Sequence, residues 1–163
     1  MSHELRFERV FDAAPEEVFD ALIDPDGLEE MYGLDEPGWI VESEGDVRVG
    51  GKWTVAFGDP RSGLHRFTHT YQALDRPRRI VYAVTQTDRD GSSFETSVEM
   101  SLEGLAGGRT MMRVVEAGFP SAGERDFHLT GLPNAFERVA RFVRERFTEV
   151  SREAEEGKEP ISG

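Results

Sequence analysis

The feature that most constrains this chain is one amphipathic stretch near its end, at residues 124–150. Apolar residues recur there at steps of three and four, which places them on one side of an α-helix. They are Leu132, Phe136, Val139, Val143, Phe147 and Val150. Because no other stretch has a long helical pattern, the rest of the chain must supply the surface against which this helix buries its apolar side.

Most of the sequence before the helix has the two-residue period of β-strands. In residues 94–102, apolar residues and one threonine alternate with glutamate and serine, as expected for a strand buried on one face. Similar patterns predict strands at residues 5–12, 39–48, 52–57, 66–74, 79–86 and 109–119. Short turns separate them, and residues 88–91 (Asp-Arg-Asp-Gly) give the clearest hairpin turn.

One or two short helices are expected after the first strand. Pro15 suits a first helical turn, and Glu16 and Glu17 suit the positive end of a helix. Apolar residues at 18, 19, 22 and 23 give this helix a core face, and residues 24–27 end it. Residues 28–32 can form a second short turn of helix.

Together these elements predict an α+β fold. Six or seven strands joined by short turns form an antiparallel sheet that twists and curls. The C-terminal helix is the element large enough to fill its concave face. We expect one domain at residues 1–150 and a polar, disordered tail at 151–163. Pro133 leaves two possibilities: the long helix bends near Gly131, or its regular part begins at Thr130 as N-cap.

Composition excludes several functions. The 163 residues carry a net charge of -13, which repels phosphate backbones and anionic lipid, so we expect neither nucleic acid nor a membrane as partner. There are no cysteines, and no apolar run approaches the roughly 20 residues of a membrane span. Residues 1–4 do not begin a signal peptide, so we expect a cytoplasmic location.

Several short motifs, in order, resemble a known family. They are residues 9–21 (RVFDAAPEEVFDA), 24–25 (DP), 49–53 (VGGKW), Tyr71, 77–82 (PRRIVY), 107–108 (GG) before Thr110, and 131–132 (GL) with Phe136 and Val139. They resemble bacterial proteins similar to the C-terminal domain of the activator of Hsp90 ATPase. That group belongs to the START-like and Bet v 1-like (SRPBCC) superfamily, which also includes polyketide cyclases.

The resemblance implies a helix-grip fold, in which a hydrophobic molecule commonly occupies the gap between helix and sheet. Two departures from the family pattern stand out. Met31 and Tyr32 stand where the family usually has a tryptophan pair, and Pro133 is unusual in its long helix. Both would alter the mouth or floor of a cavity, so a relative's ligand does not transfer to this chain.

No catalytic motif is present, and we expect no cofactor and no metal. His65 and His69 are four residues apart, but on a strand that spacing is about 13 Å, too far to share one zinc ion.

Three polar residues are expected to point inward. Arg9 lies on the more apolar face of the first strand, and His69 shares a face with Phe67 and Tyr71. Glu116 shares a face with Met112 on the last strand, and the resemblance turns that face toward the helix. One explanation is an internal ion pair and a hydrogen-bonded histidine, since buried charges need partners. The other is a polar cluster that orients an apolar ligand.

Apolar side chains at core spacing complete the candidate cavity, although such residues also build ordinary cores. The full candidate set is Arg9, Trp53, Phe57, Phe67, His69, Tyr71, Tyr82, Met100, Met112, Glu116, Leu132 and Phe136.

Three functions follow as hypotheses. The first is binding of a small hydrophobic molecule in a cavity of several hundred Å³ between sheet and helix. The second is a cyclase-like or hydrolase-like enzyme, which needs Glu116, His69 or Arg9 to converge on one substrate position. The third is a co-chaperone-like interaction module, which rests on the family name alone. A homodimer through a sheet edge or a helix is also left open.

Overall fold

The structure is a computed structural model that describes the backbone of residues 3–156 and the side chains of residues 3–146. Its elements follow the predicted order. They are β1 (His3–Phe11), α1 (Pro15–Ile23), α2 (Pro25–Met31), β2 (Ile40–Gly45), β3 (Lys52–Gly58), β4 (His65–Asp75), β5 (Arg79–Thr87), β6 (Ser93–Leu105), β7 (Arg109–Phe119) and α3 (Ala122–Glu156). The α+β class and the seven strands are confirmed.

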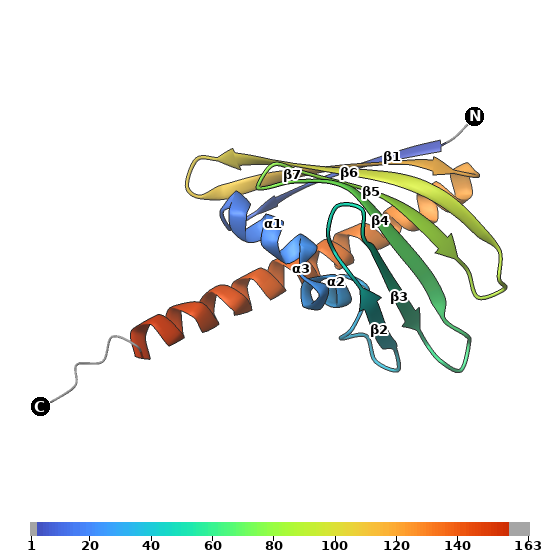
Figure 1. Ribbon diagram of the computed structural model, residues 1–163, viewed down its shortest axis with the longest axis horizontal. Coiled ribbons are helices and arrows are strands. Elements are labelled where there is room, and N and C mark those ends of the chain that lie inside the picture. Colours follow the sequence, from blue (N-terminus) through green and yellow to red (C-terminus); the bar gives the residue numbers. More distant parts are fainter. Residues whose placement is uncertain (1–2, 157–163) are drawn as a thin grey trace, which may run out of the picture.

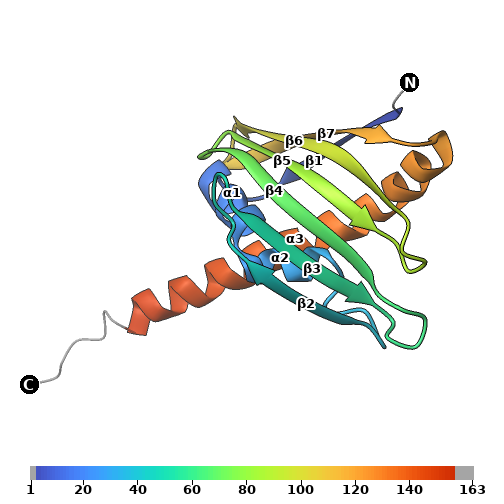
Figure 2. The ribbon, with the colours of Figure 1, turned by 45° about the vertical axis from the view of Figure 1, so that its right-hand side comes forward.

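All seven strands form one antiparallel sheet in the order β1-β7-β6-β5-β4-β3-β2. The strands from β2 to β7 follow one another as a meander. The strand β1 pairs with β7 and forms the edge of the sheet opposite β2. Figure 1 shows the sheet curving so that β2 and β3 turn toward the side on which the helices lie. The sheet therefore has a concave face, and α1, α2 and α3 all lie on that face (Figures 1 and 2).

Two prolines begin the two short helices, as the sequence indicates. Pro15 is the first residue of α1, with Glu16 and Glu17 in its first turn. Pro25 begins α2 earlier than the predicted 28–32, because the Asp24 side chain accepts a hydrogen bond from the Asp26 backbone nitrogen at 2.9 Å and caps the helix. Residues 24–27 thus separate the two helices and also form the first turn of the second.

The long helix begins at Ala122 and continues through Pro133 as one helix. The possibility that it begins with Thr130 as N-cap is therefore wrong. Ser121 caps it instead, because its Oγ accepts a hydrogen bond from the Glu124 nitrogen at 3.1 Å. The helix continues to Glu156, so the polar tail expected from residue 151 falls partly within it and, from 157 on, outside the described residues.

The apolar side of α3 is buried over only part of its length. Phe136, Val139, Ala140 and Val143 are buried, whereas no residue in 122–135 is. The helix packs against α1, α2, β1 and β7. Ion pairs hold it there, including Arg138 to Asp35 at 2.8 Å and Glu137 to Arg9 at 2.6 Å. The middle of α3 is thus fixed at the β1–β7 side of the sheet, and its first half has little packed beneath it.

Two glycines allow a test of this arrangement. A Cβ at Gly131, in the exposed first half of α3, meets no atom within 4 Å. We expect Gly131→Ala to raise the free energy of unfolding by about 0.5–1 kcal/mol, since alanine is the better helix former. Gly118 has φ +109°, and its Cβ would lie 2.8 Å from the Glu95 carbonyl oxygen, so Gly118→Ala should destabilise the fold. Urea unfolding of both variants measures this, and a loss of stability in Gly131→Ala would contradict it.

Candidate functional site

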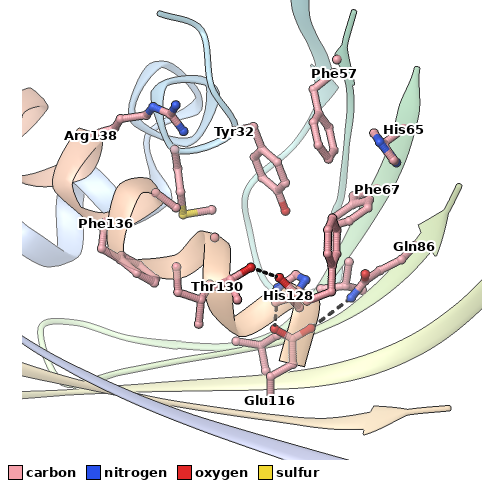
Figure 3. Close-up of a pocket in the computed structure, with 18 of the residues that line it drawn as sticks. Tyr32, Phe57, His65, Phe67, Gln86, Glu116, His128, Thr130, Phe136 and Arg138 are labelled. Carbon is pink, nitrogen blue, oxygen red and sulfur yellow. Dashed lines mark hydrogen bonds and ion pairs between the residues drawn. The ribbon is translucent and has the colours of Figure 1, made fainter. Parts of the chain in front are cut away.

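A cavity of about 490 Å³ lies between the first half of α3 and one end of the curved sheet. Every strand from β3 to β7 contributes to it, and the lining extends from that end to the middle of the sheet. Phe57 lies near the end of β3, Phe67 near the start of β4 and Gln86 near the end of β5. Thr130 and Phe136 of α3 lie on the opposite wall (Figure 3), and Leu132 of the same helix also lines the cavity. The cavity therefore occupies the space that the helix leaves open.

The walls of the cavity are mostly aromatic and aliphatic. The Tyr32 ring, just after α2, lies 4.9 Å from the Phe57 ring and 5.6 Å from the Phe67 ring, measured between centroids. Trp39 packs against Phe57 at 6.2 Å, and Val84 and Val98 line the sheet side. Phe127 of α3 also borders the cavity and is 77% exposed, so it lies where the cavity meets solvent.

A polar cluster sits on the β7 side of the cavity. Glu116 is only 5% exposed, and its Oε2 accepts hydrogen bonds from Thr96 Oγ1 at 2.7 Å and Gln86 Nε2 at 3.1 Å. His128 Nε2, from α3, lies 3.2 Å from Glu116 Oε1 (Figure 3). Both carboxylate oxygens therefore have partners, which offsets the cost of burying the charge.

A second polar group lies behind the Tyr32 ring. His69 of β4 is fully buried, and its Nε2 lies 2.6 Å from Tyr32 Oη while its Nδ1 lies 3.0 Å from Tyr71 Oη. Its ring stacks on Tyr82 at 4.5 Å. Burial lowers the pKa of His69 to about 3 and raises the pKa of Tyr32, Tyr71 and Tyr82 above the ordinary tyrosine range. All four side chains are therefore neutral at pH 7.

The structure separates the candidate residues into two groups. Those that line the cavity are Phe57, Phe67, Tyr82, Met100, Glu116, Leu132 and Phe136. Those outside its lining are Arg9, Trp53, His69, Tyr71 and Met112. Four of the latter are buried in the core, and Arg9 pairs with Glu137.

Strand register explains why Arg9 and Met112 lie outside the lining. Arg9 pairs across the ladder with Met112, whereas Glu116 pairs with Leu5. Four residues along a strand span about 13 Å, so Arg9 and Met112 lie well away from Glu116 on the same concave face. The alternation correctly predicted which face these side chains share, but they lie nearer the other end of the sheet.

Several cavity residues were not among the candidates. Met31 and Tyr32, which differ from the family pattern, both line the cavity. His128 does too, and the signal for it was its helical spacing, because it lies four residues before Leu132. Gln86 and Thr96 lie on inward-facing positions of β5 and β6, but nothing in the sequence indicated that Glu116 would be their common partner.

Neither a metal centre nor a membrane span is found within the described part of the chain. No group of three or more histidine, cysteine, aspartate or glutamate side chains there is close enough to hold a metal ion. No helix in this part is both long and apolar enough to cross a membrane.

The comparisons with known proteins agree with the topology. A sequence profile described as Activator of Hsp90 ATPase homolog 1-like protein matches residues 12–144, which is most of the chain. The chain belongs to this family. No curated protein matches it. The matched region of this family member begins just after β1 and ends in α3, so it includes every cavity residue described above.

Solved structures show the same fold. A protein from Chromobacterium violaceum is 27% identical to this family member, with a TM-score of 0.74 over 86% of this chain and 96% of that one. A protein from Rhizobium leguminosarum is 18% identical, with a TM-score of 0.74 over 89% and 96% of the two chains. One from Arthrobacter aurescens is 22% identical, with a TM-score of 0.71 over 87% and 86%. At these identities the last two show the fold alone.

The buried His69 predicts a specific pH dependence of stability. In the unfolded chain His69 takes up a proton below its ordinary pKa of 6.5, whereas in the folded chain it does so only near pH 3. The contribution of His69 to stability is therefore complete above pH 6.5 and falls as the pH drops toward 3. For one such group the loss between pH 7 and pH 5 is about 2 kcal/mol.

The variant His69→Gln isolates this contribution, because glutamine does not titrate. Urea unfolding at pH 7 and pH 5 should show a smaller acid-induced loss of stability in the variant than in the wild type. The other ionisable groups contribute equally to both proteins. Equal losses would show that His69 is not held neutral by burial.

Proposed function

We propose that the chain binds a small, mostly apolar molecule in the cavity between α3 and the sheet. The observation that carries this proposal is the cavity itself. Its volume of about 490 Å³ lies within the roughly 300–1,000 Å³ typical of small-molecule sites. Its walls are aromatic and aliphatic, and a few polar groups converge on one side, which is the usual arrangement of such a pocket.

The charges around the cavity favour a ligand that is mostly neutral. Glu116 already has Thr96, Gln86 and His128 as partners. Arg138 is engaged by Asp35 at 2.8 Å and by Glu36 at 3.1 Å, and His65 lies 2.8 Å from Asp88. Because these ionisable groups have partners within the protein, a charged ligand would have to compete with existing contacts. Arg89, the other arginine of the lining, is exposed to solvent, which screens its charge.

The family fold supports the same proposal. In helix-grip proteins the gap between helix and sheet commonly holds a hydrophobic molecule, and here the cavity occupies that gap. A flexible methionine on each side, Met31 and Met100, adds walls that adapt to an irregular ligand.

Binding is favoured over catalysis because the candidate proton-transfer groups have separate partners. His69 contacts Tyr32 and Tyr71 through its two nitrogens, and Glu116 contacts Gln86, Thr96 and His128. The enzyme hypothesis needs His69 and Glu116 to face one substrate position, and their contacts lie in different clusters. The co-chaperone role and the homodimer remain predictions.

Filling the cavity should weaken binding. Ala135 lines it from α3 and is partly exposed, so Ala135→Trp places an indole in the open space without disturbing the core. We expect at least about tenfold weaker binding of the neutral fluorophore N-phenyl-1-naphthylamine, because ligand and indole cannot share the volume.

The matched control is Ala83→Trp. Ala83 lies between Tyr82 and Val84, whose side chains face the cavity, so its own side chain faces the outside of the sheet. Fluorescence titration should show wild-type affinity for this control. Wild-type affinity in Ala135→Trp, or no binding to the wild type, would contradict the proposal.

A further inference from the structure

The hydrogen bonds behind Tyr32 determine which group it presents to the cavity. Tyr32, His69 and Tyr71 form a chain in which His69 lies between the two hydroxyl groups, at 2.6 Å and 3.0 Å. A neutral imidazole has one N–H and one lone pair on its ring nitrogens. His69 therefore donates to one tyrosine and accepts from the other, and two arrangements are possible.

The environment of Tyr71 distinguishes the two arrangements. Tyr71 is 2% exposed, and among the described residues its hydroxyl contacts no polar atom other than His69 Nδ1. If Nδ1 carried the hydrogen, the Tyr71 hydroxyl would accept from it and its own hydrogen would have no acceptor. A buried donor left without an acceptor is destabilising. The favoured arrangement is therefore Tyr71 O–H donating to Nδ1, with the histidine hydrogen on Nε2.

This arrangement leaves the Tyr32 hydroxyl hydrogen free. Nε2–H donates to Tyr32 Oη, so the oxygen serves as an acceptor on its His69 side and its hydrogen must point elsewhere. Tyr32 lines the cavity, and Figure 3 shows its hydroxyl directed into the open space between α3 and β4. Phe57, Phe67 and Trp53 surround the Tyr32 ring and hold it in this orientation.

We propose that the Tyr32 hydroxyl donates a hydrogen bond to a carbonyl oxygen of the bound molecule, so that the ligand class is neutral, apolar ketones and related carbonyl compounds. This inference rests on the proposed function, since it assigns the ligand class for the same cavity. His69 acts as a positioning residue through its tautomer. A neutral acceptor is favoured over an anionic one because the Glu116 carboxylate lies in the same cavity.

A direct test of the positioning step is the tautomer of His69 in the wild-type protein. Long-range ¹H–¹⁵N correlation spectra distinguish a protonated ring nitrogen from an unprotonated one. The expected result at pH 7 is the hydrogen on Nε2. A hydrogen on Nδ1, or on both nitrogens, would overturn the proposal, because Tyr32 would then not be forced to donate into the cavity.

The binding test compares benzophenone with diphenylmethane, which has the same two rings but no carbonyl oxygen. Displacement of N-phenyl-1-naphthylamine gives their affinities for the wild type and Tyr32→Phe. We expect the substitution to weaken benzophenone binding about three- to tenfold and to leave diphenylmethane binding unchanged.

The outcomes separate this inference from the proposed function. If both compounds bind and Tyr32→Phe affects them equally, the cavity binds apolar molecules but the carbonyl assignment is wrong. If neither compound nor the dye binds the wild type, the proposed function fails as well. Tyr82→Phe is the matched comparison, since Tyr82 also lines the cavity. Loss of the ketone preference in Tyr82→Phe but not in Tyr32→Phe would also overturn the assignment.

Discussion

The cavity exists because the apolar side of α3 is buried in the middle of the helix but not in its first half. Phe136, Val139, Ala140 and Val143 pack the middle of this helix into the core, and ion pairs through Arg138 and Glu137 fix it beside β1 and the segment after α2. Residues 122–135 lie before this anchor and bury no side chain fully. Because the sheet curves while the helix continues, the two surfaces separate, and the cavity is the space between them.

An apolar cavity collapses unless its walls are held apart. Aromatic and polar contacts hold the walls of this cavity in place. The Tyr32 ring is surrounded by Phe57 and Phe67, and its hydroxyl bonds to a fully buried histidine. On the other side, Glu116 binds two strands through Gln86 and Thr96 and contacts α3 through His128. Hydrogen bonds between buried groups of this kind make the arrangement rigid and specific.

The sequence predicted the order of elements, the fold class and the inward face of several strands. Two-residue alternation decides which side of a sheet a residue faces, and Tyr82, Met100 and Glu116 were correctly placed on the concave side. Alternation does not predict at which positions along a strand the helices pack against the sheet and at which positions a gap remains. For that reason Trp53 and Met112 shared the predicted face but lie in the packed core.

The start of α3 carries a recognisable sequence signal. Residues 121–124 read Ser-Ala-Gly-Glu, which is the Ser-x-x-Glu pattern of a capped helix start. It would have placed the start of α3 at Ala122 and shown that Pro133 lies inside the helix. With that start, His128 falls one turn before Leu132 and on the same side of the helix, which points toward the cavity. By contrast, the Tyr32–His69 contact joins residues 37 apart in the chain, and no local pattern predicts it.

The central claim is that the space between α3 and the sheet admits an apolar molecule. Methyl NMR of the wild-type protein titrated with diphenylmethane tests it most directly, because it reports the position of the ligand. We predict that the methyl signals of Val84, Val98 and Met100, which line the cavity, shift on titration, while that of Met112, which lies in the core outside it, does not. Shifts spread over the outer surface, or no shift at the three lining residues, would contradict the account.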